Sequence, residues 1–311
     1  MVFGRRVVFT TALAGVTALV GMSTATAVLT PIKILGGRTD QVGPAANASY
    51  LGFTANTTDA SDHYDAYVKA TAGGVVTKVN TGGLGWFGGI RPDTNEGIYQ
   101  QYNRRDSNLH VIDLDTMAIS PPGTGVNTNH WEFFPSISQD WILFGRIISG
   151  EKRIILFNRN TSVRTELDSI PYPGTGFIGP GNVTEKYATW TKCGKTSCNV
   201  FYYDLVAETR GRVPNPDKHY FYFGSAGDTS GKLYFVRSGN ACGARVKIQS
   251  WNIGTADPFA TVAALPAGYD VKYRTFTFVD GSSHDNVYYD QLRCSGRFFG
   301  DIYEVPSAET A

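Results

Sequence analysis

Residues 133–167 read FFPSISQDWILFGRIISGEKRIILFNRNTSVRTEL. Two apolar runs, 141–144 and 153–157, flank the polar stretch 149–152, a pattern that predicts two strands joined by a tight hairpin. A more polar third strand can follow over 161–167, and residues 135–138 can supply a fourth. The middle strands are apolar at consecutive positions, so we expect both faces of this four-stranded antiparallel sheet to be covered by copies of itself.

Copies of this unit recur along the chain. The first hairpin strand of each copy aligns at Tyr50, Ile98, Trp141, Tyr187, Leu233 and Val287, with intervals of 48, 43, 46, 46 and 54 residues. The second hairpin strand ends on an apolar residue followed by an acid or amide that can bond the backbone of the next turn; these polar residues are Asp113, Asn158, Asp204, Asn252 and Glu304. This period predicts an all-β fold, a six-bladed β-propeller of four-stranded antiparallel blades.

The sequence also predicts how the ring closes. Residues 28–35 (VLTPIKIL) precede the first unit and lack a hairpin partner, whereas the last unit lacks an outer strand. We expect 28–35 to pair with 301–305, which would remove the open edge of the last blade. A frayed N-terminus is the alternative, since terminal residues fray unless they are tied down.

The N-terminal 27 residues have the three parts of an export signal. Arg5 and Arg6 precede an apolar run over 7–20, and small residues end in the A-x-A tripeptide 25–27, which predicts cleavage after Ala27. An uncleaved signal anchor is the alternative, but the run is short for the roughly 20 residues of a membrane span. The arginine pair also resembles a twin-arginine signal, although Gly4 replaces the usual Ser or Thr, so the export route stays open. We therefore expect residues 28–311 to form one secreted domain.

Composition excludes several partners. Without Arg5 and Arg6 the 28 basic residues become 26, against 27 acidic residues, so the mature chain carries a net charge near −1. This balance, with no run of Lys or Arg, argues against nucleic acid or an anionic membrane as a partner. No further stretch is apolar enough to span a membrane, and we expect a monomer. The 35 glycines and the 13% aromatic content are typical of a turn-rich β chain.

Four cysteines in an exported chain predict disulfides, for which three pairings exist. Cys193 and Cys198 lie on opposite sides of one hairpin turn, while Cys242 and Cys294 occupy the same turn in two neighbouring units. We therefore expect the pairs Cys193–Cys198 and Cys242–Cys294. The cysteines show no zinc-ligand spacing, and the chain has no glycine-rich phosphate loop, so we expect neither a metal nor a cofactor.

FPSISQDWILFGR, followed by RIILFNRNTSVRTEL, resembles the blade of TolB-type six-bladed β-propellers of exported bacterial proteins. The resemblance covers residues 41–305 and implies a propeller fold and a bacterial cell-envelope or extracellular location. Two features depart from the family: its S-P-D-G turn reads Ser138-Gln139-Asp140-Trp141, and a separate N-terminal α/β domain is missing. TolB's role in a trans-envelope complex is therefore not implied.

Loops on a rigid scaffold commonly carry the functional site of a protein. The predicted connections between units are rich in glycine and aromatic residues and should meet on one rim of the ring. Such a rim suits a protein, peptide or glycan ligand. The candidate ligand-binding residues are Trp86, Phe87, His130, Trp131, Glu132, Tyr172, His219, Tyr220, Tyr269 and Lys272. The alternative is that the aromatic residues among them fill the centre of the ring, since large aromatic side chains are usually buried.

A catalytic site is the competing hypothesis. His130 lies near Glu132, and His219 lies near Asp217, so a hydrolase or lyase could operate at the mouth of the central channel. Structural or surface roles account for scattered histidines more simply, and the chain lacks the G-x-S-x-G and H-E-x-x-H motifs. We therefore expect an exported binding module, assign no catalytic residue, and keep the hydrolase or lyase and a purely structural envelope protein as alternatives.

Overall fold

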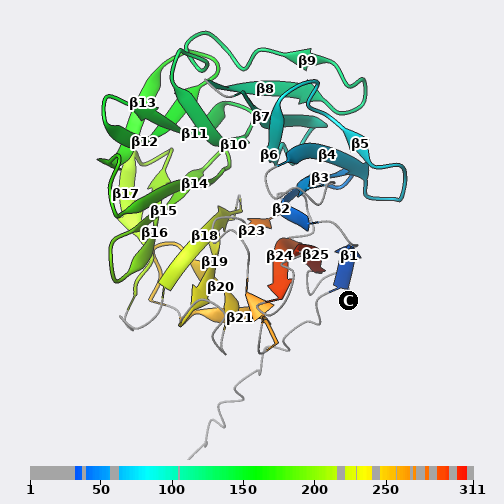
Figure 1. Cartoon of the computed structure of the whole chain (residues 1–311). Helices are drawn as coiled ribbons and strands as arrows, with labels where there is room; N and C mark the ends of the chain where they lie inside the picture. Colours follow the sequence, from blue (N-terminus) through cyan, green and yellow to red (C-terminus); the bar gives the residue numbers. More distant parts are fainter. Residues whose placement is uncertain are drawn as a thin grey trace, which may run out of the picture.

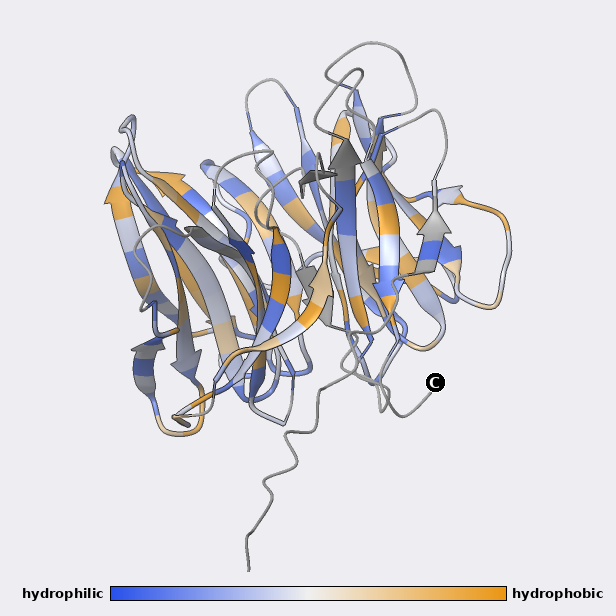
Figure 2. Cartoon of the chain, turned by 90° about the horizontal axis from the view of Figure 1, so that it is seen from below, coloured by the Kyte–Doolittle hydropathy of each residue, from blue (hydrophilic) through white to orange (hydrophobic). Residues whose placement is uncertain are grey.

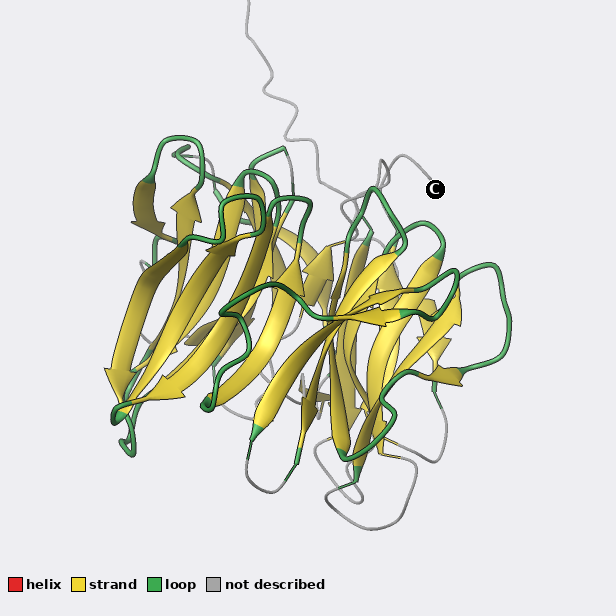
Figure 3. Cartoon of the chain, turned by 90° about the horizontal axis from the view of Figure 1, so that it is seen from above, coloured by secondary structure: helices red, strands yellow, loops and turns green. Residues whose placement is uncertain are grey.

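The computed structural model describes residues 32–36, 40–56, 63–103, 106–215, 221–228, 230–239, 246–256, 258–266, 269–270, 277–279, 286–293 and 300–306. All regular structure within these ranges is β-strand (Figure 3), which confirms the all-β prediction. The sheets are arranged around a common centre (Figure 1), and the loops lie at both ends of the strands. No helix in the described ranges is long and apolar enough to cross a membrane.

Three antiparallel sheets have four strands each, in chain order from the centre outwards. The first contains β2 (Asp40–Ala46), β3 (Tyr50–Asn56), β4 (Tyr64–Ala70) and β5 (Thr77–Lys78). The second contains β14 (Phe177–Val183), β15 (Tyr187–Cys193), β16 (Cys198–Asp204) and β17 (Thr209–Arg212). The third contains β18 (Phe221–Gly227), β19 (Lys232–Ser238), β20 (Lys247–Asn252) and β21 (Ala260–Ala264).

An eight-stranded sheet joins two further units of the same kind. It contains β6 (Leu84–Ile90), β7 (Glu96–Tyr102), β8 (Ser107–Asp113), β9 (Ile119–Ser120), β10 (Trp131–Ile137), β11 (Trp141–Ile148), β12 (Glu151–Asn158) and β13 (Arg164–Pro171). One parallel bridge, between Ser107 and Trp131, connects β8 to β10. The pairings β6–β7–β8–β9 and β10–β11–β12–β13 are antiparallel, so each half repeats the four-stranded pattern.

The last sheet contains both ends of the described chain. It is formed by β22 (Tyr269–Asp270), β23 (Thr277–Val279), β24 (Val287–Arg293), β25 (Gly300–Val305) and β1 (Ile32–Leu35). β1 pairs antiparallel with β25, with Ile32 opposite Glu304 and Lys33 opposite Tyr303. The ammonium of Lys33 also lies 2.6 Å from Asp301 Oδ2. Residues 28–31, the start of the predicted closing strand, lie outside the described residues.

The hairpin at 133–167 has the predicted topology with shifted limits. β11 and β12 pair from Trp141 opposite Asn158 to Ile148 opposite Glu151. The connecting turn is only Ser149 and Gly150, shorter than predicted, and both residues have positive φ (52° and 77°), as a two-residue hairpin turn requires. The polar outer strand begins at Arg164 rather than at residue 161, because the turn before it is longer than expected.

Polar residues at the end of the third strand of a unit bind the turns that the repeat predicts. Oδ1 of Asp113 accepts hydrogen bonds from the N–H groups of Asp115 and Thr116, each over 3.0 Å. Asn158 binds the N–H groups of residues 160 and 161, and Asp204 binds those of residues 206 and 207. These bonds satisfy the turn backbone and end the third strand.

Consecutive apolar residues contact different hydrophobic clusters. Ile142, Leu143 and Phe144 are all fully buried in β11. Ile142 and Phe144 pack in a cluster with β7, β8 and β12, whereas Leu143 packs in another with β13, β14 and β15. The prediction that both faces of this sheet are covered is therefore confirmed. Figure 2 shows apolar residues recurring along the strands of adjacent sheets.

Candidate functional site

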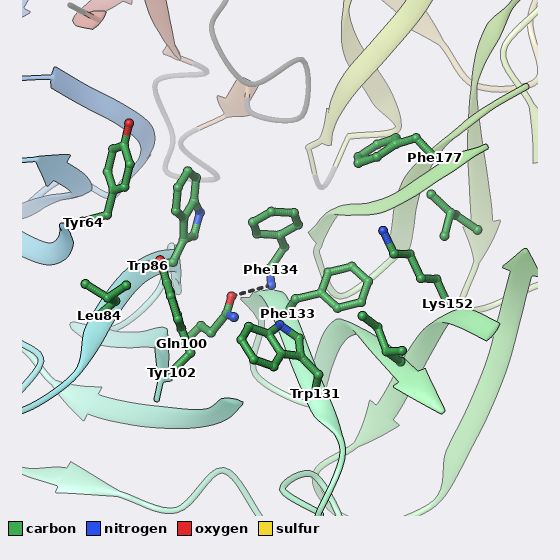
Figure 4. A pocket seen from close by; sticks show the side chains of 12 residues that line it. Tyr64, Leu84, Trp86, Gln100, Tyr102, Trp131, Phe133, Phe134, Lys152 and Phe177 are labelled. Carbon is green, nitrogen blue, oxygen red and sulfur yellow. Dashed lines mark hydrogen bonds between the residues drawn. The ribbon is translucent and has the colours of Figure 1, made fainter. Parts of the chain in front are cut away.

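A cavity of about 470 Å³ lies where the first strands β6, β10 and β14 of three successive units begin. Figure 4 shows the side chains around it. They comprise seven aromatic and three aliphatic side chains, one amide and one cation: Tyr64, Leu84, Trp86, Gln100, Tyr102, Trp131, Phe133, Phe134, Ile147, Lys152, Phe177 and Ile178.

Ring contacts hold most of the aromatic residues that line the cavity. The Trp86 ring lies 5.9 Å from Tyr64 and 5.5 Å from Phe134, measured between centroids, and Phe134 meets Phe133 edge to face at 5.5 Å. Trp131 packs against Tyr102 at 5.9 Å. Such contacts between large side chains hold their rings in place, so this side of the cavity is preformed.

A β-bulge directs two consecutive residues of β10 into the cavity. The pairing of β10 with β11 shifts between Phe133 and Ser136, and Phe134 has φ +49°. Side chains of a regular strand alternate, so Phe134 would lie on the opposite face from Phe133. The bulge turns it to the same side as Phe133, at the cost of a left-handed conformation that non-glycine residues rarely adopt.

A buried polar chain fixes this bulge. The N–H of Phe134 donates to Gln100 Oε1 (Figure 4), and Gln100 Nε2 donates to Ser107 Oγ over 2.8 Å. The Ser107 hydroxyl in turn donates to the backbone carbonyl of Glu132. Gln100 and Ser107 are buried, so these bonds are shielded from water.

A buried ion pair lies behind the cavity wall. Glu132 is fully buried; its Oε1 lies 2.9 Å from Arg146 Nε and accepts a 2.7 Å hydrogen bond from the hydroxyl of Thr128. Arg146 also donates to the carbonyl of Val126 over 2.7 Å. Burial raises the pKa of Glu132 against the opposing effects of Thr128 and Arg146, and burial lowers the pKa of Arg146. Glu132 does not line the cavity, so the pair stabilises β10 from the other face.

Four of the candidate residues lie in strands, not in connecting loops. Trp86 and Phe87 belong to β6, and Trp131 and Glu132 belong to β10. Their prediction as loop residues is wrong, because the strands begin earlier than the apolar pattern alone indicates. Trp86 and Trp131 line the cavity. Phe87 instead fills the core, packing so closely on Gly52 that a Cβ there would meet its ring at 2.1 Å.

The other candidates are placed only in part. His130 is half-buried just before β10, and its hydrogen bond among the described residues is that of its backbone N–H to Thr128 Oγ1. Tyr172 follows β13, is 42% exposed, and receives the ammonium of Lys152 over its ring at 4.7 Å. Tyr269 begins β22, and only its backbone is described. His219, Tyr220 and Lys272 lie outside the described residues.

One of the two expected disulfides is present. Cys193 ends β15, Cys198 begins β16, and their sulfurs are bonded across the hairpin. Cys242 and Cys294 lie outside the described residues. In the part of the chain that the structure describes, no group of three His, Cys, Asp or Glu side chains could hold a metal ion.

Sequence reasoning missed most of the cavity. Tyr64, Gln100, Tyr102, Phe133, Phe134 and Lys152 were not candidates, because they belong to hairpins and strands that the repeat explains. Phe177 ends a predicted connection, 171–177, from which only Tyr172 was a candidate. One signal was available for Phe134. When the innermost strands β2, β10 and β18 are aligned, Phe134 lies level with Gly43 (φ +60°) and Gly224 (φ +55°). An aromatic residue therefore occupies a position that favours glycine.

No protein-family model matches the chain, and no curated protein sequence matches it. Solved structures do. A putative TolB from Agrobacterium tumefaciens matches with a TM-score of 0.55 at 14% identity, over 87% of this chain and 92% of that one. TolB from Acinetobacter baumannii matches with a TM-score of 0.51 at 14% identity, over 87% of this chain. This chain spans only 63% of that TolB's length.

Oligogalacturonate lyase from Vibrio parahaemolyticus matches with a TM-score of 0.52 at 10% identity, over 92% of this chain and 96% of that one. Identities this low show the fold alone. The chain is therefore a β-propeller of the TolB-like fold.

Proposed function

We propose that this protein is an exported binding module that receives an apolar side chain of another protein or of a peptide in the aromatic cavity. The observation that carries the proposal is the wall of seven aromatic side chains around about 470 Å³. A cavity of this size that is largely apolar and preformed is typical of a ligand site.

A glycan is a weaker fit to the same cavity. Sugar hydroxyls need several hydrogen-bonding groups beside an aromatic plane, because unpaired polar groups are costly to bury. Here the described lining offers one amide, one ammonium and two indole N–H groups besides the tyrosine hydroxyls, and both polar ends of Gln100 are already bonded to Phe134 and Ser107. The apolar lining therefore favours a protein or peptide ligand.

The geometry gives less support to a hydrolase or lyase. Glu132, the carboxylate nearest in sequence to His130, is bonded to Arg146 and Thr128 on the far side of β10 from the cavity. A general base must reach the reacting proton directly or through one water. Glu132 does not have that access, so it is better suited to stabilising the wall than to catalysis.

The finer architecture belongs to this proposal. We propose a signal peptide over 1–27 and a single domain over 28–311, with six blades, the last one completed by the N-terminal strand. The β1–β25 pairing supports this closure, as does the cluster in which Leu51 and Phe53 of β3 pack with Tyr288 and Ile302 of the last sheet. The Cys193–Cys198 disulfide fits an oxidising location outside the cytoplasm.

The experiment that tests the function compares two tryptophan variants on peptide and glycan arrays. Trp131→Ala removes a half-buried cavity residue, whereas Trp141→Ala removes a half-buried tryptophan at the opposite end of the β10–β11 pair. We expect the wild type and Trp141→Ala to bind the same apolar peptides and Trp131→Ala to lose at least tenfold in affinity. Selective glycan binding, or equal peptide binding by all three proteins, contradicts the proposal.

A further inference from the structure

Lys152 is the only charged residue among the described residues that line the cavity. It is half-buried and is the second residue of β12, which follows the hairpin turn of Ser149 and Gly150. Its side chain points toward the space between Phe133, Phe134 and Phe177 (Figure 4). An ammonium group is therefore held at the edge of an otherwise apolar cavity.

No carboxylate of the described chain neutralises this ammonium. Other lysines have such partners: Lys78 lies 2.8 Å from Asp65, and Lys192 lies 2.8 Å from Asp168. The adjacent Glu151 is directed to Arg153 instead, at 2.9 Å. Among the described residues, Lys152 forms no ion pair, and its ammonium lies over the face of the Tyr172 ring.

The contact with Tyr172 holds the cation without cancelling its charge. A tyrosine face attracts an ammonium through its quadrupole and remains neutral. A ligand carboxylate arriving beside apolar walls would meet a positioned charge in a medium less polar than water, where the attraction is stronger than in bulk solvent. Among the described residues, the cavity lining thus combines a largely apolar surface with one positive charge that no carboxylate pairs.

We infer that the ligand is an acidic protein segment, in which an aromatic or aliphatic side chain enters the cavity while a carboxylate beside it binds Lys152. The inference rests on the proposed function and deepens it. Charge complementarity favours this occupant, because none of the described residues that line the cavity is a carboxylate that could bind a basic segment.

The test uses capped pentapeptides in which a central phenylalanine is followed by glutamate, glutamine or lysine. Binding is measured by fluorescence anisotropy on the wild type, Lys152→Met and Lys152→Glu. Methionine keeps an apolar stem beside Tyr172, so the variant removes mainly the charge. Lys186→Met is the matched control, because Lys186 is also half-buried over a tyrosine ring, at 5.3 Å from that of Tyr187, but does not line the cavity.

We expect the wild type and Lys186→Met to bind the glutamate peptide about tenfold more tightly than the glutamine peptide, the factor that corresponds to about 1.4 kcal/mol. Lys152→Met should bind both equally, and Lys152→Glu should prefer the lysine peptide. The wild-type preference should also shrink as salt is raised. Equal wild-type affinity for glutamate and glutamine peptides would overturn this inference and leave the proposed function intact, whereas binding of none of the peptides would overturn both.

Discussion

The backbone N–H of Phe134 in β10 donates a hydrogen bond to the side-chain carbonyl of Gln100 in β7 over 3.2 Å. This bond joins two successive units of the propeller at the cavity wall. It also holds Phe134 at φ +49°, where a side chain is strained. Strain of this kind commonly persists where it positions a functional group.

Phe134→Gly should therefore be more stable than Phe134→Ala, the reverse of the usual order for these two residues within a strand. Both variants delete the ring, but only glycine relieves the left-handed conformation. We expect Phe134→Gly to have a free energy of unfolding about 1 kcal/mol higher than that of Phe134→Ala, measured by urea denaturation. Both should lose peptide binding at the cavity. An alanine variant as stable as the glycine variant would show that the bulge is not strained at this residue.

The effects of replacing Glu132 and Arg146 on the free energy of unfolding should be strongly coupled. Removing either partner leaves the other charge buried, so Glu132→Gln and Arg146→Met should each lower the free energy of unfolding by about 3–5 kcal/mol. The double variant should lose clearly less than the sum of the two losses. Denaturation of the four proteins forms a double-mutant cycle that measures this difference.

Arg153→Met serves as the surface control for this cycle. Arg153 lies 2.9 Å from Glu151 and 3.0 Å from Glu166, and all three side chains are substantially exposed. Arg153→Met should lower the free energy of unfolding by less than about 1 kcal/mol. Additive losses in the Glu132 and Arg146 cycle would mean that the two charges do not interact in solution.

Asp168 should make stability depend on pH in the acid range. Burial opposes its ionisation, but hydrogen bonds from Lys192 and Trp190 and the charge of Arg210 outweigh burial and hold the pKa of Asp168 below the usual value of an aspartate. Its carboxylate therefore stabilises the fold above the unfolded-state pKa, and this stabilisation is lost as pH falls through the folded-state value.

At pH 7 the free energy of unfolding of Asp168→Asn should accordingly be lower than that of the wild type. The expected difference is about 1–3 kcal/mol, typical of losing hydrogen bonds to a charged group. The difference should narrow progressively below about pH 4, close to the usual pKa of an aspartate. Thermal denaturation at several pH values checks both statements. A difference that stays constant from pH 7 to pH 2 would rule out the ionised carboxylate as its source.

Ring closure through β1 predicts slow hydrogen exchange at the N-terminus. The amides of residues 32–35 that pair with β25 should exchange at least about a hundredfold more slowly than those of a free peptide, because they exchange only when the pairing opens. Residues 73–76 provide an internal comparison, since Val75 is 85% exposed in a loop. Exchange at 32–35 as fast as at 73–76 would contradict closure.

The features of the fold that depend on local sequence could be predicted correctly. Strands begin at Tyr50, Trp141, Tyr187 and Val287, where the repeat places the first hairpin strand. Cys193 and Cys198 lie opposite each other because the hairpin turn between them is short. Consecutive apolar positions correctly indicated sheets covered on both faces, since burial of both faces leaves no solvent-exposed side for polar residues.

The cavity depends on tertiary register, which the repeat pattern does not contain. The bulge that turns Phe134 toward Phe133 appears only when β10 is paired with β11. Lys152 was assigned to a polar turn, and its place beside an aromatic cavity follows from where that turn meets β14 and β10. Gln100 reads as an ordinary strand residue until its partner Phe134 is brought in from the next unit.

The single bridge between Ser107 and Trp131 has a consequence for local unfolding. It makes β6 to β13 one continuous sheet, whereas the sheets on either side are separate. Trp131 is also part of the cavity wall, and the Ser107 hydroxyl binds the next carbonyl along β10. Residues 84–171 should therefore open as one cooperative unit, so that a bound ligand slows exchange even at amides far from the cavity.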